Sequence, residues 1–88
     1  MTLRLRRDVS TADTGTGLVL LDQAAGRYWQ LNPTGALVLR MLLDGATEAE
    51  VARTLAARHA VDVERAGTDV TALVESLRAA KVVEETAL

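Results

Sequence analysis

The hydrophobic pattern of the chain changes its period close to residue 32, and this change limits the folds that the sequence can adopt. Before that point the apolar residues come in short runs or alternate with polar ones, as they do in strands. After it they recur every three to four residues, as on one face of a helix. Strands followed by helices are typical of an α+β fold in which the helices pack on one face of the sheet.

Three segments of the N-terminal part have the pattern of strands. Alternation over Leu3–Arg7 predicts a short edge strand, and Leu18–Asp22 and Arg27–Leu31 predict two more. The stretch Asp8–Gly17 is rich in Ser, Thr, Asp and Gly and predicts a loop. Gly26 can adopt a positive φ and therefore favours a four-residue hairpin turn before the last strand. We expect a three-stranded antiparallel meander.

Three helix-start signals divide the rest of the chain. Asn32, followed by proline, caps a first helix that stops before Gly45. A capping box begins at Thr47 and starts a second helix that ends near His59, and Asp62 can cap a third. The apolar positions expected to be buried are Leu37, Val38, Met41 and Leu42, then Val51, Ala52, Leu55 and Ala56, then Ala66, Val70, Leu73, Val74 and Leu77, with Val82 and Val83 closing the core.

The composition agrees with one small folded domain that spans residues 1–88. Hydrophobic residues make up 49% of the 88 residues, which suffices for one core and argues against disorder. The chain has no cysteine, so a disulfide framework, a thiolate nucleophile and a cysteine zinc site are excluded. No apolar run approaches the roughly 20 residues that a membrane span needs, and no signal-peptide pattern is present. We expect a cytoplasmic protein with no membrane contact.

The sequence lacks the group of reactive side chains that an enzyme needs. His59 is the only histidine, and helical spacing places it at a helix end, where it can meet the helix carbonyls as a cation. A catalytic or metal role for it would need partners that the sequence does not offer. The glycines around Thr16 have neither the lysine of a P-loop nor the spacing of a dinucleotide loop. We expect no catalysis, no metal and no cofactor.

The segment Tyr28–Val38 carries the most specific pattern in the chain. It joins an aromatic residue and a leucine to Asn-Pro-Thr-Gly-Ala at the expected strand–helix junction, and a Leu-Leu-Asp-Gly stop follows at residues 42–45. A weaker pattern in the third helix is carried by Asp69, Val70, Leu73, Val74 and Leu77. On these residues the chain resembles, over nearly its whole length, the PqqD-like recognition elements for ribosomally made, post-translationally modified peptides. It is most similar to the discrete leader-binding proteins of lasso peptide biosynthesis, although Leu39 stands where many relatives carry a tryptophan.

The resemblance implies a binding function. Such domains bind the leader segment of a precursor peptide and deliver it to a separate leader peptidase, of the cysteine-protease type, or to a modifying enzyme. The leader adds as an extra strand to the strand expected at Arg27–Leu31, and its side chains reach a cleft beside the third helix. The residues expected to bind the peptide are Arg27, Tyr28, Trp29, Gln30, Leu31, Asp69, Val70, Leu73, Val74, Leu77 and Arg78.

The strand pattern supports this route without requiring it. As the outer strand of a meander, Arg27–Leu31 would leave N–H and C=O groups unpaired along one edge, and strand addition would use them. Alternation places Trp29 and Leu31 on one face, so they can be core residues as well as walls of a peptide pocket. The apolar stripe of the third helix can likewise be core. Asp69 and Arg78 can be solvated charges or can orient a charged leader.

A winged helix-turn-helix regulator that binds DNA has the same outline and is the alternative. The chain carries a formal net charge of −2, and the third helix would expose more acidic than basic residues. Phosphates would repel such a helix, and the basic patch of Arg4, Arg6 and Arg7 is small. We therefore expect no nucleic-acid partner. An exposed strand edge also permits pairing between copies, although we favour a monomer.

Overall fold

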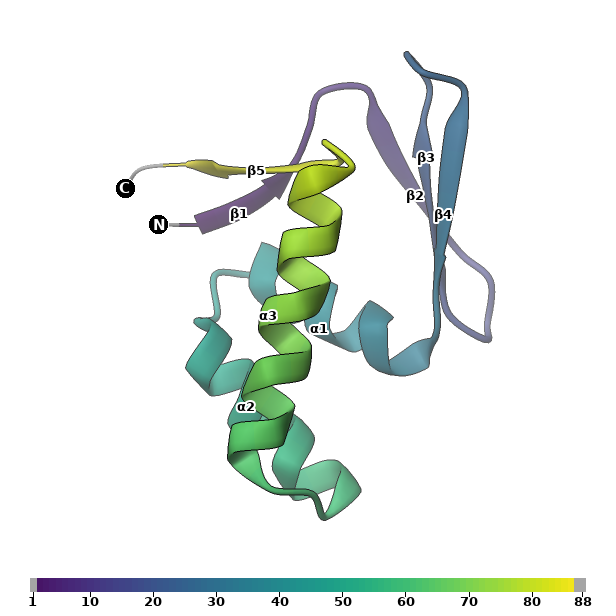
Figure 1. Ribbon diagram of the computed structural model, residues 1–88. Coiled ribbons are helices and arrows are strands. Elements are labelled where there is room, and N and C mark those ends of the chain that lie inside the picture. The colour runs from purple at the N-terminus through teal and green to yellow at the C-terminus, as the bar shows by residue number, and fades with distance from the viewer. Residues whose placement is uncertain (1, 87–88) are drawn as a thin grey trace.

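The computed structural model describes residues 2–86, which form five strands and three helices. Figure 1 shows a three-stranded sheet on one side of the molecule and three helices beside it. The elements in chain order are β1 (Thr2–Leu5), β2 (Val9–Asp13), β3 (Leu18–Asp22), β4 (Arg27–Leu31), α1 (Pro33–Leu43), α2 (Glu48–His59), α3 (Val63–Ala79) and β5 (Val83–Thr86). The predicted α+β class is confirmed.

The three-stranded sheet is antiparallel and has the order β2-β3-β4. Leu18 and Leu20 of the central strand are buried, and they lie opposite Leu31 and Trp29 of β4 on the same face of the sheet. The four-residue turn between β3 and β4 ends at Gly26, whose φ of 67° is the positive value that the sequence favours. β4 is therefore an edge strand, and no strand among residues 2–86 pairs with its outer side.

The prediction for the N-terminal segment is wrong in two respects. Val9–Asp13, expected to be part of a loop, is β2, a strand whose side chains are mostly exposed and polar and so give no apolar alternation. β1 does not join the meander but pairs with β5, and a hydrogen bond of 3.1 Å from Arg4 Nε to Glu84 Oε1 crosses that pair. These two residues are 80 positions apart, so no local pattern indicates the pairing.

The three helices begin at the predicted caps. The Asn32 Oδ1 atom accepts a hydrogen bond of 2.8 Å from the Gly35 N–H, and Asp62 caps α3 in the same manner. Thr47 and Glu50 form a reciprocal capping box at the start of α2. The hydrogen bond that the Thr47 backbone N–H donates to Glu50 lowers the pKa of the Glu50 carboxyl. Local chemistry therefore sets the helix boundaries.

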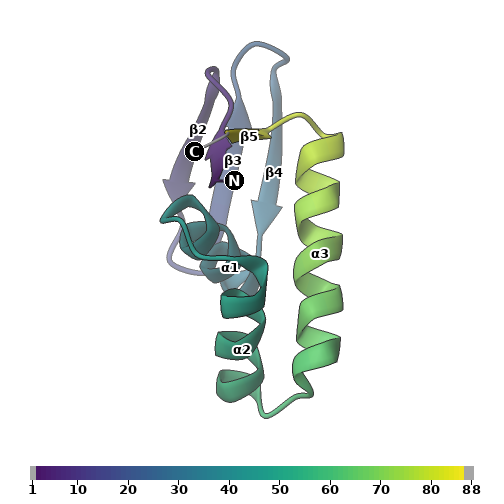
Figure 2. The same ribbon diagram turned by 90° about the vertical axis from the view of Figure 1, so that its left-hand side faces the viewer.

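One hydrophobic core joins β1, β3, β5 and the three helices, which pack on the same side of the sheet as Leu20. Figure 2 shows α1 and α2 below the sheet and α3 to one side of it. In α1 the buried stripe is turned from the predicted one, because Ala36 and Leu39 point inward while Leu37 and Met41 are half-buried. The predicted stripes of α2 and α3 are buried, apart from the half-buried Ala56 and Leu73. Val82 and Val83 close the core as predicted.

Two glycines differ in the space that their surroundings leave for a side chain. Gly17 packs against the end of β4, and a Cβ placed on it would overlap the carbonyl oxygen of Leu31. Gly67 lies inside α3, where an added Cβ would meet only the Ala52 Cβ, at 3.8 Å, which is an ordinary contact. The first glycine therefore permits a close approach of two backbone segments, whereas the second has no such role.

The same substitution should consequently change stability in opposite directions at these two positions. Gly17→Ala should lower the free energy of unfolding by about 1–3 kcal/mol, because the end of β4 must move. Gly67→Ala should raise it by about 0.5–1 kcal/mol, because alanine is the better helix former. Urea unfolding followed by circular dichroism measures both. A loss of stability in Gly67→Ala, or none in Gly17→Ala, would contradict this account of the packing.

Candidate functional site

The direction of the main-chain groups along β4 follows from the hydrogen bonds between the other two strands of the sheet, β2 and β3. The Gln23 N–H donates to the Asp8 carbonyl (3.0 Å) and the Thr14 N–H donates to the Gly17 carbonyl (3.1 Å). The register between β2 and β3 is continuous between these two bonds. In an antiparallel pair each residue turns both its N–H and its C=O to one side, and the next residue turns them to the other. Odd-numbered residues of β3 therefore direct their N–H and C=O groups toward β2, and even-numbered residues direct theirs toward β4.

The same alternation continues into β4. The even-numbered residues of β3 lie opposite Arg27, Trp29 and Leu31, which consequently direct their main-chain groups toward β3. Tyr28 and Gln30 direct theirs away from the sheet, along the open edge. Two N–H donors and two C=O acceptors are thus available to an added strand.

The side chains of β4 divide between the two faces of the sheet as predicted. Trp29 and Leu31 are half-buried and pack against the core. The Arg27 guanidinium lies 5.2 Å from the centroid of the Trp29 ring, a cation–π contact that helps to hold the ring at this edge. On the other face Tyr28 is 67% exposed, beside its cross-strand partner Leu21, which is 42% exposed. The strand therefore offers one aromatic residue to each face.

A hollow of about 520 Å³ opens where β4 passes into α1. Its walls come from the start of α1, the end of α2 and the first half of α3. The lining residues are apolar (Val38, Leu55, Val61, Ala66, Val70 and Leu73) or polar (Asn32, Thr34, His59, Arg65 and Asp69), with Gly35 between them. Apolar walls with a few polar groups are typical of a site that takes an apolar side chain.

The structure brings together some of the residues that the sequence predicts for the site. Asp69, Val70 and Leu73 line the hollow next to the end of β4. The next two apolar residues of the α3 stripe, Val74 and Leu77, are each only 3% exposed and belong to the core. Of the residues predicted on α3, the hollow therefore includes only the three nearest the N-terminus of the helix.

Arg78 is placed apart from these residues. It forms an ion pair with Glu85 and lines a separate hollow beside β1 and the connection between α1 and α2. Sequence reasoning also leaves out the lining residues from the three helices and their flanking segments, namely Asn32, Thr34, Gly35, Val38, Leu55, His59, Val61, Arg65 and Ala66. Of these, only Val61 could have been indicated by the sequence, because an apolar residue is unexpected in so short a connection between two helices. In the structure it is 41% exposed.

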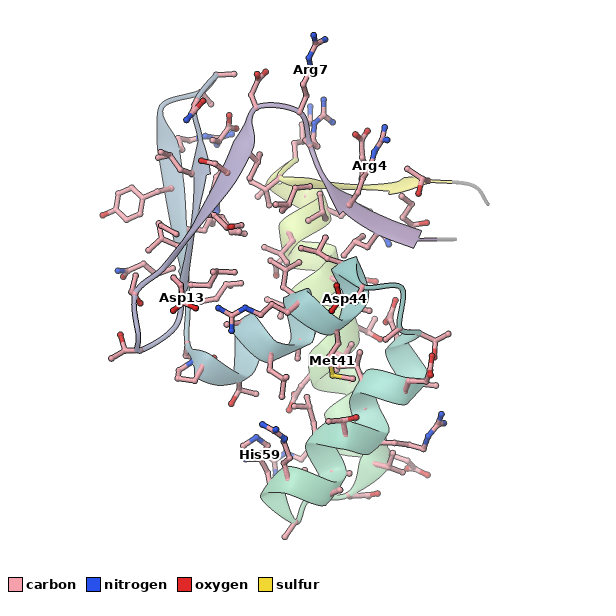
Figure 3. The ribbon with its side chains drawn as sticks, turned by 180° about the vertical axis from the view of Figure 1, so that it is seen from behind. Arg4, Arg7, Asp13, Met41, Asp44 and His59 are labelled. Carbon is pink, nitrogen blue, oxygen red and sulfur yellow. The ribbon has the colours of Figure 1, made fainter. Side chains whose placement is uncertain are left out.

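His59 lies on the rim of the apolar hollow beside the end of β4, at the end of α2 that points away from the strands (Figure 3).

Within residues 2–86, no three or more His, Cys, Asp or Glu side chains are grouped so that they could hold a metal ion. None of the described helices has the length and apolar character needed to cross a membrane.

Amide hydrogen exchange should follow the alternation along β4. In the free protein the Tyr28 and Gln30 amides should exchange at least about tenfold faster than the Trp29 amide, because only the last donates within the sheet. NMR-detected exchange measures these rates, and the Leu20 amide of the central strand is the protected reference. Equal rates for Tyr28, Trp29 and Gln30 would contradict the assignment of the outward groups.

Comparisons with known proteins identify the family of the chain. Residues 17–83 match the family described as Coenzyme PQQ synthesis protein D (PqqD), whereas no curated protein matches the chain. A solved structure of a lasso peptide synthetase B1 complexed with the leader peptide is 42% identical, with a TM-score of 0.92. It covers 97% of this chain and 100% of its own.

A second solved structure is similar in fold. It is TbiB1 in complex with the TbiA(beta) leader peptide, with 23% identity, a TM-score of 0.85 and coverage of 100% of both chains. At this identity the likeness concerns the fold alone. The family match spans more than half of the chain and includes the strand–helix junction Tyr28–Val38 on which the resemblance was recognised. The chain therefore belongs to the PqqD family.

Proposed function

We propose that this chain binds the leader segment of a ribosomally synthesised precursor peptide and has no catalytic activity of its own. It presents the leader to a partner leader peptidase or modifying enzyme in lasso peptide biosynthesis. The observation that carries the proposal is the open edge of β4 beside an apolar hollow. The 42% identity to a lasso peptide synthetase B1 that was solved with a leader peptide supports the choice of ligand.

The leader adds to the sheet as a fourth strand, antiparallel to β4. Its main chain bonds to the outward groups of Tyr28 and Gln30, so the main chain supplies affinity without reading the sequence. Because it runs antiparallel, its first paired residues lie next to Leu31. A side chain at that point reaches the apolar hollow. Trp29, half-buried on the same face of the sheet as the core, is the proposed wall of the groove between the leader and the helices. These pockets supply the specificity that pairing cannot.

The affinity of this complex should be moderate. The leader is disordered before it binds, and fixing its backbone costs roughly 1 kcal/mol or more per residue. We therefore expect a dissociation constant between about 10 nM and 1 µM.

A winged helix-turn-helix DNA-binding regulator is the less well supported alternative. The three helices beside the β3–β4 hairpin fit that outline. However, Glu64, Asp69 and Glu75 are exposed on α3, the helix that would have to approach the phosphates. We accordingly propose a peptide ligand and no nucleic-acid partner.

Substitutions at neighbouring positions of β4 should have unequal effects on leader binding. Trp29→Ala should weaken binding by about 2 kcal/mol, or about 30-fold, because it removes a wall of the groove. Tyr28→Ala is the matched control, because it shortens an aromatic side chain on the other face and keeps the same outward main-chain groups. Calorimetric titration with a synthetic leader of the cognate precursor measures both, and circular dichroism verifies the fold. Equal weakening by the two variants would be inconsistent with the proposed groove.

The outer face of the sheet is where we expect the partner enzyme to make contact. Leu21 and Tyr28 are large, exposed apolar side chains there, and Tyr28 belongs to the same strand that pairs with the leader. A partner seated on this face would lie next to the bound leader. This arrangement would raise the local concentration of the substrate for the partner.

Leader binding and partner stimulation should therefore be separable. With its cognate leader peptidase, the unaltered chain should lower the apparent KM for the precursor, while the chain alone leaves the precursor intact. The double variant Leu21→Ala/Tyr28→Ala should bind the leader within about twofold of the unaltered chain but lose about tenfold or more of the stimulation. A cleavage assay with and without the peptidase tests this. Cleavage by the chain alone would refute the proposal that it is not catalytic. Full stimulation by the double variant would refute the proposed partner contact on the outer face of the sheet.

A further inference from the structure

Four cations gather at the end of β4 that is opposite to the apolar hollow. Arg6 and Arg7 come from the corner between β1 and β2, Arg27 begins β4, and Lys81 follows α3. Together they line one hollow of about 280 Å³. Figure 3 shows Arg7 on that corner, at the opposite end of the molecule from His59.

The acidic residues on this hollow offset the four cations only in part, because three carboxylates face four cations and leave a formal excess of one positive charge. Asp22 is buried and accepts hydrogen bonds from the two backbone N–H groups of Ala24 and Ala25, both at 3.1 Å. Glu84 forms its ion pair with Arg4, outside the cluster. Asp8 is the third acid on the lining. Among residues 2–86, no ion pair within 4.0 Å includes any of the four cations, although the whole chain has a net charge of −2.

The backbone holds Lys81 in a conformation that disfavours any side chain. Its φ is 61°, and its N–H donates to the Arg78 carbonyl (3.0 Å) while the Val82 N–H donates to the Leu77 carbonyl (3.2 Å). Glycine is the usual residue at this position of a helix end. The Arg6 N–H donates to the Val82 carbonyl (3.0 Å), which ties the β1–β2 corner to the same place. A cation is thus fixed next to the arginines at a position that favours glycine.

A simple structural role accounts for only part of this cluster. A lysine just past a helix C-terminus interacts favourably with the helix dipole, and this applies to Lys81. Arg27 likewise has its cation–π contact with the Trp29 ring. Arg6 and Arg7 belong to no helix and form no ion pair within 4.0 Å among residues 2–86, so neither explanation covers them.

We propose that the cluster formed by Arg6, Arg7, Arg27 and Lys81 binds acidic residues of the leader that lie just C-terminal to its paired segment. This inference rests on the proposed function. A leader antiparallel to β4 enters beside Leu31 and leaves beside Arg27, so the part that leads toward the modified segment passes over the four cations. Charge complementarity there would select the register of the leader and speed its association.

The test uses charge-swapped peptides, so that it does not depend on the natural leader's charges. A leader of the cognate precursor is synthesised with either Glu-Glu or Lys-Lys directly after the paired segment. At about 50 mM salt the unaltered chain should bind the Glu-Glu peptide at least about fivefold more tightly than the Lys-Lys peptide. At about 500 mM salt the difference should fall below about twofold.

Two double variants separate the cluster from the charge of the whole chain. Arg6→Gln/Lys81→Gly should lose most of the preference for Glu-Glu, whereas Arg53→Gln/Arg58→Gln on α2, which also removes two positive charges, should keep it. Lys81→Gly alone should unfold at a higher urea concentration, because glycine tolerates the φ of 61°, so its weaker binding of the Glu-Glu peptide cannot result from misfolding.

The possible failures are distinguishable. Equal affinities of the unaltered chain for the two peptides, with new protection of the Tyr28 and Gln30 amides, overturn this inference and leave the proposed function in place. If neither peptide binds, the proposed function fails and the inference with it. Equally tight binding of random duplex DNA that depends on Arg6 and Lys81 would assign the cluster to nucleic acid and overturn it.

Discussion

The unpaired main-chain edge of β4 is the constraint on which the functional interpretation of this structure depends. A sheet that ends in a strand with free N–H and C=O groups is open to pairing with another chain, and proteins usually cover or disrupt such an edge. Here the sheet ends at β4 with Tyr28 and Gln30 directed outward. The edge is flanked by an apolar hollow at one end and by cations at the other. An edge with such neighbours is suited to one kind of partner, an extended peptide.

The second edge of the same sheet, β2, differs in its chemistry. Four of its five side chains are exposed and three are polar, and Asp13 at its end forms an ion pair of 2.6 Å with Arg40 of α1. Figure 3 shows Asp13 at the end of that strand, facing the helix side. Main-chain pairing alone would not distinguish the two edges. The side chains and the hollows around β4 make the difference, and they are the reason for proposing β4 as the edge that pairs with the leader.

Sequence reasoning succeeded where local chemistry decides the structure. The caps at Asn32, Thr47 and Asp62 set the starts of the helices, and the meander strand at Arg27–Leu31 follows from its alternation and the turn at Gly26. It failed for β1, because its partner β5 is distant in sequence. It also failed for β2, which pairs with the neighbouring β3 but has no apolar alternation.

The same division applies to the site. The helical stripe of α3 identifies residues that face inward, but it cannot tell the half-buried Leu73 from the fully buried Val74. Nor can it show that Arg78 lies apart from the hollow, or that the end of α2 supplies Leu55 and His59 to its wall. Such a wall is assembled from three helices, so it is absent from the pattern of any one of them.

The most direct measurement compares leader binding by Gln30→Pro and Gln30→Ala. Both variants lose the same side chain, but only proline removes the N–H that points to the open edge, and neither breaks a bond to β3. If the leader pairs with β4, Gln30→Ala should bind within about twofold of the unaltered chain, and Gln30→Pro should lose about tenfold or more of the affinity. Equal affinities of the two variants, with both folded, would contradict strand addition at β4.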